Sequence, residues 1–142
     1  MKWLYKGKEI NEISDLPNNA FGFVYQTTHL PTNKKYIGKK SLIYNLKKKL
    51  GKKEKALYEG KGRPPTFKRV LKESDWKTYY GSHAFIKDAN DEDLERTILQ
   101  IAYNKKELTY LECKYQFISE VLEDKKYLND NILGKFYDRD LR

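Results

Sequence analysis

Two short runs of aromatic and β-branched residues, separated by a turn, constrain the fold of this chain more than any other feature. Residues 21–28 (FGFVYQTT) have the side chains that strands favour. Residues 31–34 (PTNK) have turn chemistry, and residues 35–38 (KYIG) form a short return strand. The sequence therefore predicts a β-hairpin that places Tyr25 and Tyr36 on adjacent strands, with their hydroxyls converging at one end.

Two further segments predict the elements that pack beside this hairpin. Residues 95–103 are almost continuously apolar, which is typical of a central strand. Residues 107–122 repeat apolar side chains at helical spacing, so they predict an amphipathic helix. The buried stripe of that helix is expected to be Leu108, Leu111, Tyr115, Ile118 and Leu122. The predicted class is α/β (α+β), a small three-stranded, mostly antiparallel sheet flanked by helices.

The remaining segments give weaker signals. Residues 1–20 are expected to form an N-terminal arm. A helix capped by Ser41 is predicted over residues 41–50, because leucines recur there every four residues. Residues 47–66 are expected to be a basic loop insertion, a candidate for disorder in the absence of a partner. Further short elements are expected at residues 67–72 (strand or turn), 74–80 and 82–87 (helices). Without repeats or a clean linker, residues 1–142 are predicted to form a single domain.

The positive charge of the chain is concentrated in one window. Residues 39–72 hold thirteen Lys or Arg and two acids, which gives +11, whereas the net charge of the whole chain is +9. A localised positive field favours binding of a polyanion such as nucleic acid. A solvated lysine-rich loop is the alternative. A membrane surface fits less well, because the window lacks exposed Trp or Phe beside a long amphipathic helix.

Several classes of protein and site are disfavoured by composition. There is no run of about 18 apolar residues and no apolar signal-peptide centre, so we expect a cytoplasmic protein. Cys113 is the only cysteine, which fits a reducing compartment. With His29 and His83 as the only histidines, a structural zinc site is disfavoured. A catalytic metal would need carboxylate and water ligands, which points to a hard cation such as Mg²⁺.

The tyrosine pair and one helical glutamate are the candidate chemical groups. Tyr25 and Tyr36 could act on a water molecule, although a tyrosine with a pKa of about 10 is a poor base. Lys39 and Lys40 could supply a field that favours phenolate. Glu112 lies at the shoulder of the apolar stripe, where a carboxylate can hold a cation. The alternative for the two tyrosines is that they are ordinary strand aromatics, since the chain has twelve tyrosines. The alternative for Glu112 is a solvated glutamate on the flank of the helix.

These residues resemble the signature of the GIY-YIG nuclease family. Residues 22–25 (GFVY) and 36–38 (YIG) are similar to its two triplets, with Phe for the usual Ile and one extra residue before the first tyrosine. The tyrosines are eleven residues apart, which is typical of the family. The segment 107–118 resembles the family helix that carries a metal-binding glutamate, which places that glutamate at Glu112.

The resemblance spans residues 21–131 and continues beyond this helix. Residues 127–129 (YLN) match the later family segment in which an asparagine closes the site, here Asn129. Residues 73–82 are similar to a stretch of phage-encoded members. The resemblance therefore implies a stand-alone catalytic domain of the phage type, located in the host cytoplasm.

The arginine of the family is the hardest residue to place. It usually follows the second triplet by one or two helical turns, where this chain has only the lysines 47–49. With residues 47–66 as an insertion, Arg69 matches the family spacing best and Arg63 second; a plain surface charge is the alternative. His83 stands where some members carry a histidine that assists proton transfer, and a helix-start role is its alternative.

The resemblance implies metal-dependent hydrolysis of DNA phosphodiester bonds. Glu112 would anchor one Mg²⁺ or Mn²⁺, mostly through water, with Asn129 orienting it. Tyr25, Tyr36 and His83 would position and deprotonate the attacking water. Arg69 and a lysine after the second triplet would neutralise the developing charge, and cleavage would leave a 5′ phosphate. The residues expected to contact DNA are Lys39, Lys40, Lys47, Lys48, Lys52, Lys53, Lys61, Arg63 and Lys68.

The expected partner is double-stranded DNA, with relaxed sequence specificity because no separate DNA-binding domain is evident. One active site cuts one strand, so a homodimer is one route to a double-strand break. Two other functions stay open. One is a basic protein that binds nucleic acid without cutting it. The other is a phage regulator of a host factor with Trp3, Trp76 and Tyr79 as anchors, whose binding should survive high salt.

Overall fold

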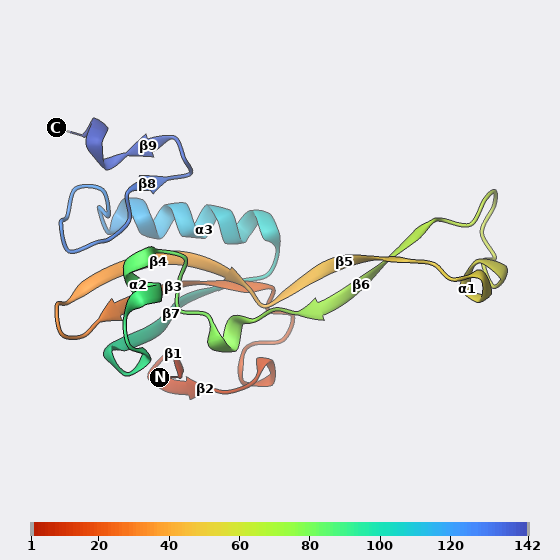
Figure 1. Cartoon of the computed structure of the whole chain (residues 1–142), viewed down its shortest axis with the longest axis horizontal. Coiled ribbons are helices and arrows are strands. Elements are labelled where there is room, and N and C mark those ends of the chain that lie inside the picture. Colours follow the sequence, from red (N-terminus) through yellow and green to blue (C-terminus); the bar gives the residue numbers. More distant parts are fainter. Residues whose placement is uncertain (1, 142) are drawn as a thin grey trace. The chain divides into compact units, whose positions relative to one another are not determined.

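A computed structural model describes residues 2–141 of the chain. They form two compact units (Figure 1). The first, here the sheet unit, contains residues 2–42 and 75–141. The second, here the lysine hairpin, contains residues 43–74.

A five-stranded sheet organises the sheet unit. Its strands are β1 (Trp3–Tyr5), β2 (Lys8–Ile10), β3 (Gly22–His29), β4 (Lys34–Ser41) and β7 (Leu94–Ala102), in the order β2-β1-β7-β3-β4. The predicted hairpin is present as β3 and β4, and the predicted central strand is β7, which has neighbours on both sides. Only β1 and β7 run parallel. The mixed, mostly antiparallel fold class is therefore confirmed.

The sheet has two more strands than the three predicted, and the N-terminal arm provides them. β1 pairs with β7 and β2 pairs with β1. Trp3 is 1% exposed and packs edge-on against Phe23, with ring centroids 4.8 Å apart. Burial of this indole adds the arm to the sheet, because a Trp side chain contributes a large apolar area to a core.

The predicted long helix is α3 (Lys105–Ile118). The Asn104 side chain accepts a hydrogen bond from the Glu107 N–H, which satisfies one free amide of the first turn. Leu108 and Leu111 bury its inner stripe against the face of the sheet that carries Val24. The opposite face carries an aromatic core that contains Trp3, Phe23, Tyr25 and Trp76. Side chains alternate between the two faces along β3, so Phe23 and Tyr25 pack in the aromatic core and Val24 packs against α3.

Short elements complete the sheet unit. They are η1 (Ile13–Asp15), η2 (Trp76–Thr78), α2 (Ala84–Asp88), η3 (Asp91–Asp93), β8 (Asn131–Ile132), β9 (Phe136–Tyr137) and η4 (Asp138–Asp140). The helix expected at 82–87 is α2, and His83 is its N-cap residue. In the part of the chain that the structure describes, no helix is long and apolar enough to cross a membrane.

The lysine hairpin replaces the helix predicted over residues 41–50, and that prediction was wrong. β5 (Ile43–Lys49) pairs in antiparallel fashion with β6 (Phe67–Glu73), and α1 (Lys52–Ala56) follows β5 (Figure 1). A leucine every four residues fits a helix and also fits a strand with period two. Leu46 is 40% exposed and lies opposite Val70, so pairing with a distant strand decided between the two periods.

Candidate active site

The two signature tyrosines lie on neighbouring strands and on the same face of the sheet. Tyr25 on β3 is opposite Gly38 on β4, and Tyr36 is opposite Thr27, so the tyrosines are diagonal neighbours. Their ring centroids are 6.4 Å apart. A Cβ atom at position 38 would lie 2.6 Å from the Tyr25 hydroxyl oxygen. The glycine of the second triplet is therefore what lets the Tyr25 ring lie across β4.

Burial dominates the electrostatics of this pair. Tyr25 is 1% exposed, and desolvation raises its pKa well above that of a free tyrosine, with further contributions from Tyr79 and Tyr36. Burial also raises the pKa of Tyr36, although its hydrogen bond to Ser82 opposes this effect. Both side chains are therefore neutral phenols at neutral pH, and both can donate a hydrogen bond.

The cationic field expected from Lys39 and Lys40 does not lower these pKa values, so that prediction was wrong. The Lys39 ammonium donates to the Thr109 hydroxyl oxygen at 2.9 Å. The Lys40 ammonium pairs with the Asp75 carboxylate at 2.5 Å and lies 4.1 Å from the centroid of the Tyr79 ring. Each lysine is thus engaged by a neighbour, and desolvation of the tyrosines is the larger effect.

Three buried side chains on β1, β3 and β7 fix the segment 76–80 against the sheet by donating to its carbonyls. They are Trp3 Nε1 to Trp76 (2.7 Å), Thr27 Oγ1 to Tyr80 (2.7 Å), and Arg96 Nη1 to Lys77 (3.0 Å) and Tyr79 (2.9 Å). Arg96 is 3% exposed and also stacks on the rings of Trp3 and Tyr80. This arginine therefore has a structural role, as it holds the segment that leads into Ser82 and His83.

Ser82 and His83 follow this fixed segment and lie beside Tyr36. The hydroxyl oxygens of Tyr36 and Ser82 are 3.3 Å apart, and the His83 ring centroid is 6.0 Å from that of Tyr36. His83 Nδ1 accepts a hydrogen bond of 3.1 Å from the Phe85 N–H as the cap of α2. A neutral His83 ring therefore carries its proton on Nε2, where it is a hydrogen-bond donor rather than a base.

Tyr79 belongs to the same cluster, although the sequence suggested it only as an anchor for a protein partner and not as a catalytic residue. Its ring packs edge-on against Tyr25 with centroids 6.0 Å apart, and the two side chains are hydrogen-bonded. Lys40 lies over its ring. Repeated Tyr residues in the segment 79–82 were the available signal. Only the tertiary contacts separate Tyr79, which faces Tyr25, from Tyr80, which covers Arg96.

The outer edge of β4 is capped by side chains and by the C-terminal segment. The N–H and carbonyl of Lys35 bond to the Lys126 carbonyl and the Leu128 N–H at 2.8 and 2.7 Å. Two residues along, the Asn129 amide accepts from the Ile37 N–H at 3.1 Å and donates to the Ile37 carbonyl at 2.8 Å. The asparagine thus replaces a neighbouring strand at an edge that would otherwise be open.

Glu112 caps the next outward-facing position of the same edge. Its carboxylate accepts a hydrogen bond from the main chain of Lys39. Desolvation nevertheless raises the pKa of Glu112, because it outweighs the Lys39 charge and that hydrogen bond. A half-buried carboxylate with a raised pKa is stabilised in its ionised form by an added cation. Glu112 therefore has the chemistry of a metal ligand.

A polar pocket of about 270 Å³ lies against this edge. It is lined by Tyr36, Lys39, Glu112, Gln116, Asn129, Asp130, Asn131, Leu133 and Gly134. Carboxylate and amide oxygens dominate this lining, and such oxygens are the ligands that hard cations prefer. Within residues 2–141, no group of three or more His, Cys, Asp or Glu side chains is placed to hold a metal ion. A cation bound by Glu112 would thus lack a third such side chain and would complete its shell with other oxygens, such as the amide oxygens of this lining or water.

The predicted site residues divide between the two units. Tyr25, Tyr36, His83, Glu112 and Asn129 belong to the sheet unit, together with Lys39 and Lys40. Arg69 and Arg63 belong to the lysine hairpin, where both are exposed. The other predicted DNA contacts in the lysine hairpin are Lys47, Lys48, Lys52, Lys53, Lys61 and Lys68. Arg69 lies on β6 opposite Lys47.

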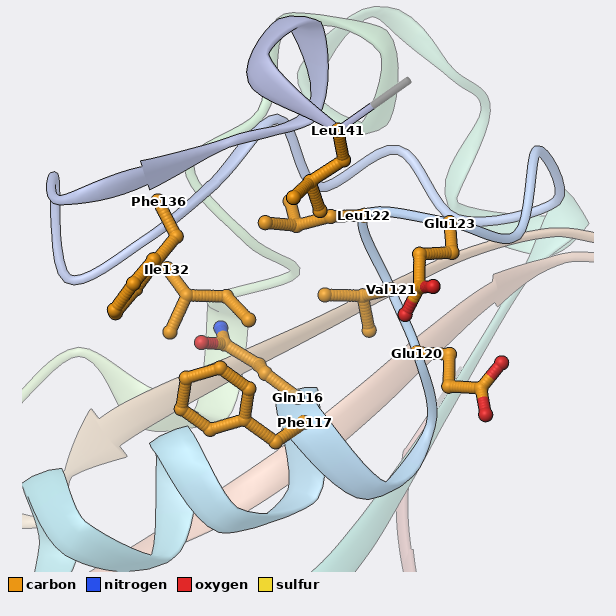
Figure 2. A pocket seen from close by; sticks show the side chains of 9 residues that line it. All are labelled: Gln116, Phe117, Glu120, Val121, Leu122, Glu123, Ile132, Phe136 and Leu141. Carbon is orange, nitrogen blue, oxygen red and sulfur yellow. The ribbon is translucent and has the colours of Figure 1, made fainter.

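An apolar pocket at the C-terminal end of α3 is a separate feature. Figure 2 shows Phe117, Ile132, Phe136 and Leu141 converging there, with the two carboxylates that line the pocket, Glu120 and Glu123, at one side. The lining has no cationic side chain. A phosphate would find no favourable charge in this pocket, so the chemistry of the site belongs to the polar pocket beside β4.

The fold and this site define a nuclease-like class: an aromatic hairpin beside a polar pocket with a carboxylate on the adjoining helix. Comparison with known proteins supports this nuclease-like class. A family model described as "Putative endonuclease segE, GIY-YIG domain" matches residues 3–132. No curated protein and no solved structure matches the chain significantly. Because the family model covers most of the chain, the protein belongs to the GIY-YIG endonuclease family.

Proposed function

We propose that this protein is a metal-dependent endonuclease that hydrolyses phosphodiester bonds of double-stranded DNA. The observation that carries the proposal is the polar pocket in which Tyr36, Lys39 and Glu112 line the same space. Phosphodiester hydrolysis needs a positioned water, neutralisation of phosphate charge and stabilisation of the leaving oxygen. The pocket brings together a hydroxyl, a cation and a carboxylate for these tasks.

Glu112 is the proposed anchor for Mg²⁺ or Mn²⁺. When bound, such an ion would act as a Lewis acid on the scissile phosphate and on the leaving oxygen. Asn129 holds the outer edge of β4 at Ile37. The next outward-facing residue of this edge is Lys39, whose main chain donates a hydrogen bond to Glu112. The Lys39 ammonium, which lines the same pocket, is suited to neutralise phosphate charge. Arg69, in the lysine hairpin, is proposed as a further cation for the phosphates of the substrate.

The tyrosines act as neutral phenols in this proposal. Tyr36, hydrogen-bonded to Ser82, orients the attacking water, and Tyr25 supports it through the buried hydrogen bond with Tyr79. Since burial raises the pKa of both tyrosines, the proton of the water passes to solvent or to a phosphate oxygen rather than to a resident phenolate. His83, with its proton on Nε2, donates to the phosphate. Attack by water leaves a 5′ phosphate.

Plasmid nicking tests this function. Supercoiled plasmid is incubated with wild type, Glu112→Gln and Glu123→Gln, each in Mg²⁺, Mn²⁺ and EDTA. Glu123 is an exposed glutamate of the sheet unit and provides the matched control. We expect nicking by wild type and Glu123→Gln in metal only, and a loss on the order of 100-fold or more for Glu112→Gln. Intact plasmid with wild type in both metals would remove the enzyme proposal, and normal cutting by Glu112→Gln would remove the metal site.

Two alternatives are separated by the same samples. A nucleic-acid-binding protein without activity would retain plasmid in a gel-shift assay and never nick it. A regulator of a host factor is disfavoured by burial, since two of its three expected anchors, Trp3 and Trp76, are 1% and 0% exposed. These indoles are part of the aromatic core and have no surface for a partner.

A further inference from the structure

The lysine hairpin carries nearly all of the net charge of the chain. Residues 43–74 contain eleven Lys or Arg and three acids, which gives +8 of the total +9. The residues outside this segment are therefore almost neutral. A charge concentrated on 32 residues needs a polyanionic partner to be favourable, because like charges on one small unit repel one another.

The pairing of β5 with β6 places like charges directly opposite each other. Lys47 faces Arg69, and Lys48 faces Lys68. Such cross-strand pairs destabilise a sheet. An ion pair within this unit joins Lys68 to Glu54 at 2.5 Å. This arrangement weakens the ribbon by itself and becomes favourable when phosphates lie beside the cations.

Cations occupy both faces of the ribbon. Opposed residues share a face, and successive residues alternate between faces. One face therefore carries Lys47, Lys49 and Arg69, and the other carries Lys48, Lys68 and Lys72. Every residue of both strands is exposed or half-buried. An element that rests on a flat phosphate surface needs cations on one face only, whereas an element inside a groove has phosphates on both sides.

The dimensions of the ribbon fit the major groove of B-form DNA. Strands of seven residues are about 23 Å long and lie about 4.8 Å apart. The major groove is about 12 Å wide and admits a two-stranded ribbon, whereas the minor groove is only about 6 Å wide. Leu46 is exposed on one face of the ribbon, and Phe67 and Leu71 are exposed on the other, so both faces also carry apolar side chains beside their cations.

We propose that β5 and β6 form a two-stranded ribbon that inserts into the major groove of duplex DNA, with cations of both faces contacting the two phosphate walls. This inference rests on the proposed function only in its choice of DNA as the partner. It assigns groove recognition to the lysine hairpin, and it requires a duplex rather than a single strand.

Two double variants test the proposal in the full-length protein. Lys47→Gln with Lys49→Gln removes two charges from one face, and Lys48→Gln with Lys72→Gln removes two from the other. Arg69 stays unchanged, so the proposed catalytic cation is kept. A control replaces exposed lysines of the sheet unit, Lys105 and Lys135, by Gln. Because each ribbon variant removes like-charge repulsion, both should fold, which thermal unfolding checks.

Binding to a 20-base-pair duplex is measured in EDTA over a range of salt concentrations, so cleavage does not interfere. We expect each ribbon variant to flatten the slope of log K against log salt by about two, and the control to leave it unchanged. An effect of one face alone would overturn the groove model in favour of a flat contact. An effect no larger than that of the control, or equal affinity and slope for a single strand, would also overturn it.

The groove itself is identified by chemical protection. Dimethyl sulfate methylates guanine N7 in the major groove, so wild type should protect guanines within its binding site and the ribbon variants should not. Unprotected guanines, or competition by the minor-groove ligand distamycin, would overturn the assignment. These readouts are independent of Glu112. Failure of the groove model would leave plasmid nicking intact, and failure of the nuclease proposal would leave the salt slopes intact.

Discussion

At the scale of single residues, the signature positions have physical reasons that can be stated atom by atom. Gly38 leaves room for the Tyr25 hydroxyl, since a Cβ would lie 2.6 Å from it. Gly22 leaves room for the Lys40 carbonyl, since a Cβ there would also lie at 2.6 Å. Each glycine thus permits a close approach between β3 and its surroundings. Tyr25 is held by this packing rather than by a cation.

Replacement of Gly38 by Ala should therefore disturb the site directly. The added methyl group must displace the Tyr25 ring, so we expect a loss of about 1–3 kcal/mol in the free energy of unfolding, together with reduced nicking. Urea denaturation and the plasmid assay measure the two effects. Gly51→Ala is the control, because nothing lies within 4 Å of its Cβ position and its φ is −76°. Wild-type stability of Gly38→Ala would contradict this steric argument.

The raised pKa of Glu112 predicts how the stability of the metal-free protein depends on pH. In the unfolded chain a glutamate titrates at about 4.3. Between that value and the higher pKa in the folded protein, the folded state binds more protons, so the free energy of unfolding falls as pH rises. Above this window the ionised carboxylate destabilises the folded state.

Glu112→Gln should remove this destabilisation. In EDTA we expect the variant to be more stable than wild type at neutral pH, and the two to converge as the pH is lowered towards about 4. Denaturation curves over this pH range test the expectation, with Glu123→Gln as the control. A variant that is less stable than wild type by the same amount at every pH would show that the hydrogen bond from Lys39 outweighs desolvation.

At the scale of elements, the edge strand β4 connects the fold to the site. Its outward-facing groups at Lys35, Ile37 and Lys39 are bonded by the C-terminal segment, Asn129 and Glu112 in turn. Gln116 donates a further hydrogen bond of 3.0 Å to the Ile37 carbonyl. The same contacts that close a sheet edge therefore place the proposed metal ligand beside the tyrosine hairpin.

Asn129→Ala tests this connection. The change leaves the buried N–H of Ile37 without its partner, which should cost about 1–3 kcal/mol of unfolding free energy. Hydrogen exchange should also show faster exchange of the Ile37 amide. Asn90→Ala is the matched control, because Asn90 is exposed and its side chain makes no capping hydrogen bond. Equal stability of the two variants would mean that water replaces the lost amide.

The elements also differ in how far their sequences predicted them. The patterns of β3, β7 and α3 can each be read within a single segment of the sequence, and all three elements were predicted. β5 was predicted as a helix, because residues 43–49 contain no local feature that separates the two structures. Its partner β6 begins eighteen residues after β5 ends, and only their pairing makes the segment a strand.

At the scale of the whole molecule, catalytic groups and positive charge are assigned to different units. Five of the six predicted catalytic residues belong to the sheet unit, whose net charge is close to zero. The lysine hairpin carries the remaining one, Arg69, and most of the charge. We therefore expect mutations in the lysine hairpin to change affinity for a polyanion and mutations in the sheet unit to change catalysis.

The sequence by itself determined the hairpin, the central strand, the long helix and the family. Each follows from short-range patterns: alternation for strands, helical spacing for α3, and the two triplets for Tyr25 and Tyr36. The excess of lysine in one window also indicated a polyanionic partner from charge alone. These properties are local because side-chain periodicity and composition are read within one segment.

Only the tertiary structure decided how those groups act. Burial, which depends on the whole core, raised the pKa values of the tyrosine pair where neighbouring lysines in the sequence suggested the opposite. Contacts across long separations brought Tyr79 to Tyr25 and Asn129 to Ile37. Pairing with β6 makes β5 a strand of a two-stranded ribbon, although the sequence predicted a helix there. Desolvation, edge capping and strand pairing all arise between distant segments, so no local pattern encodes them.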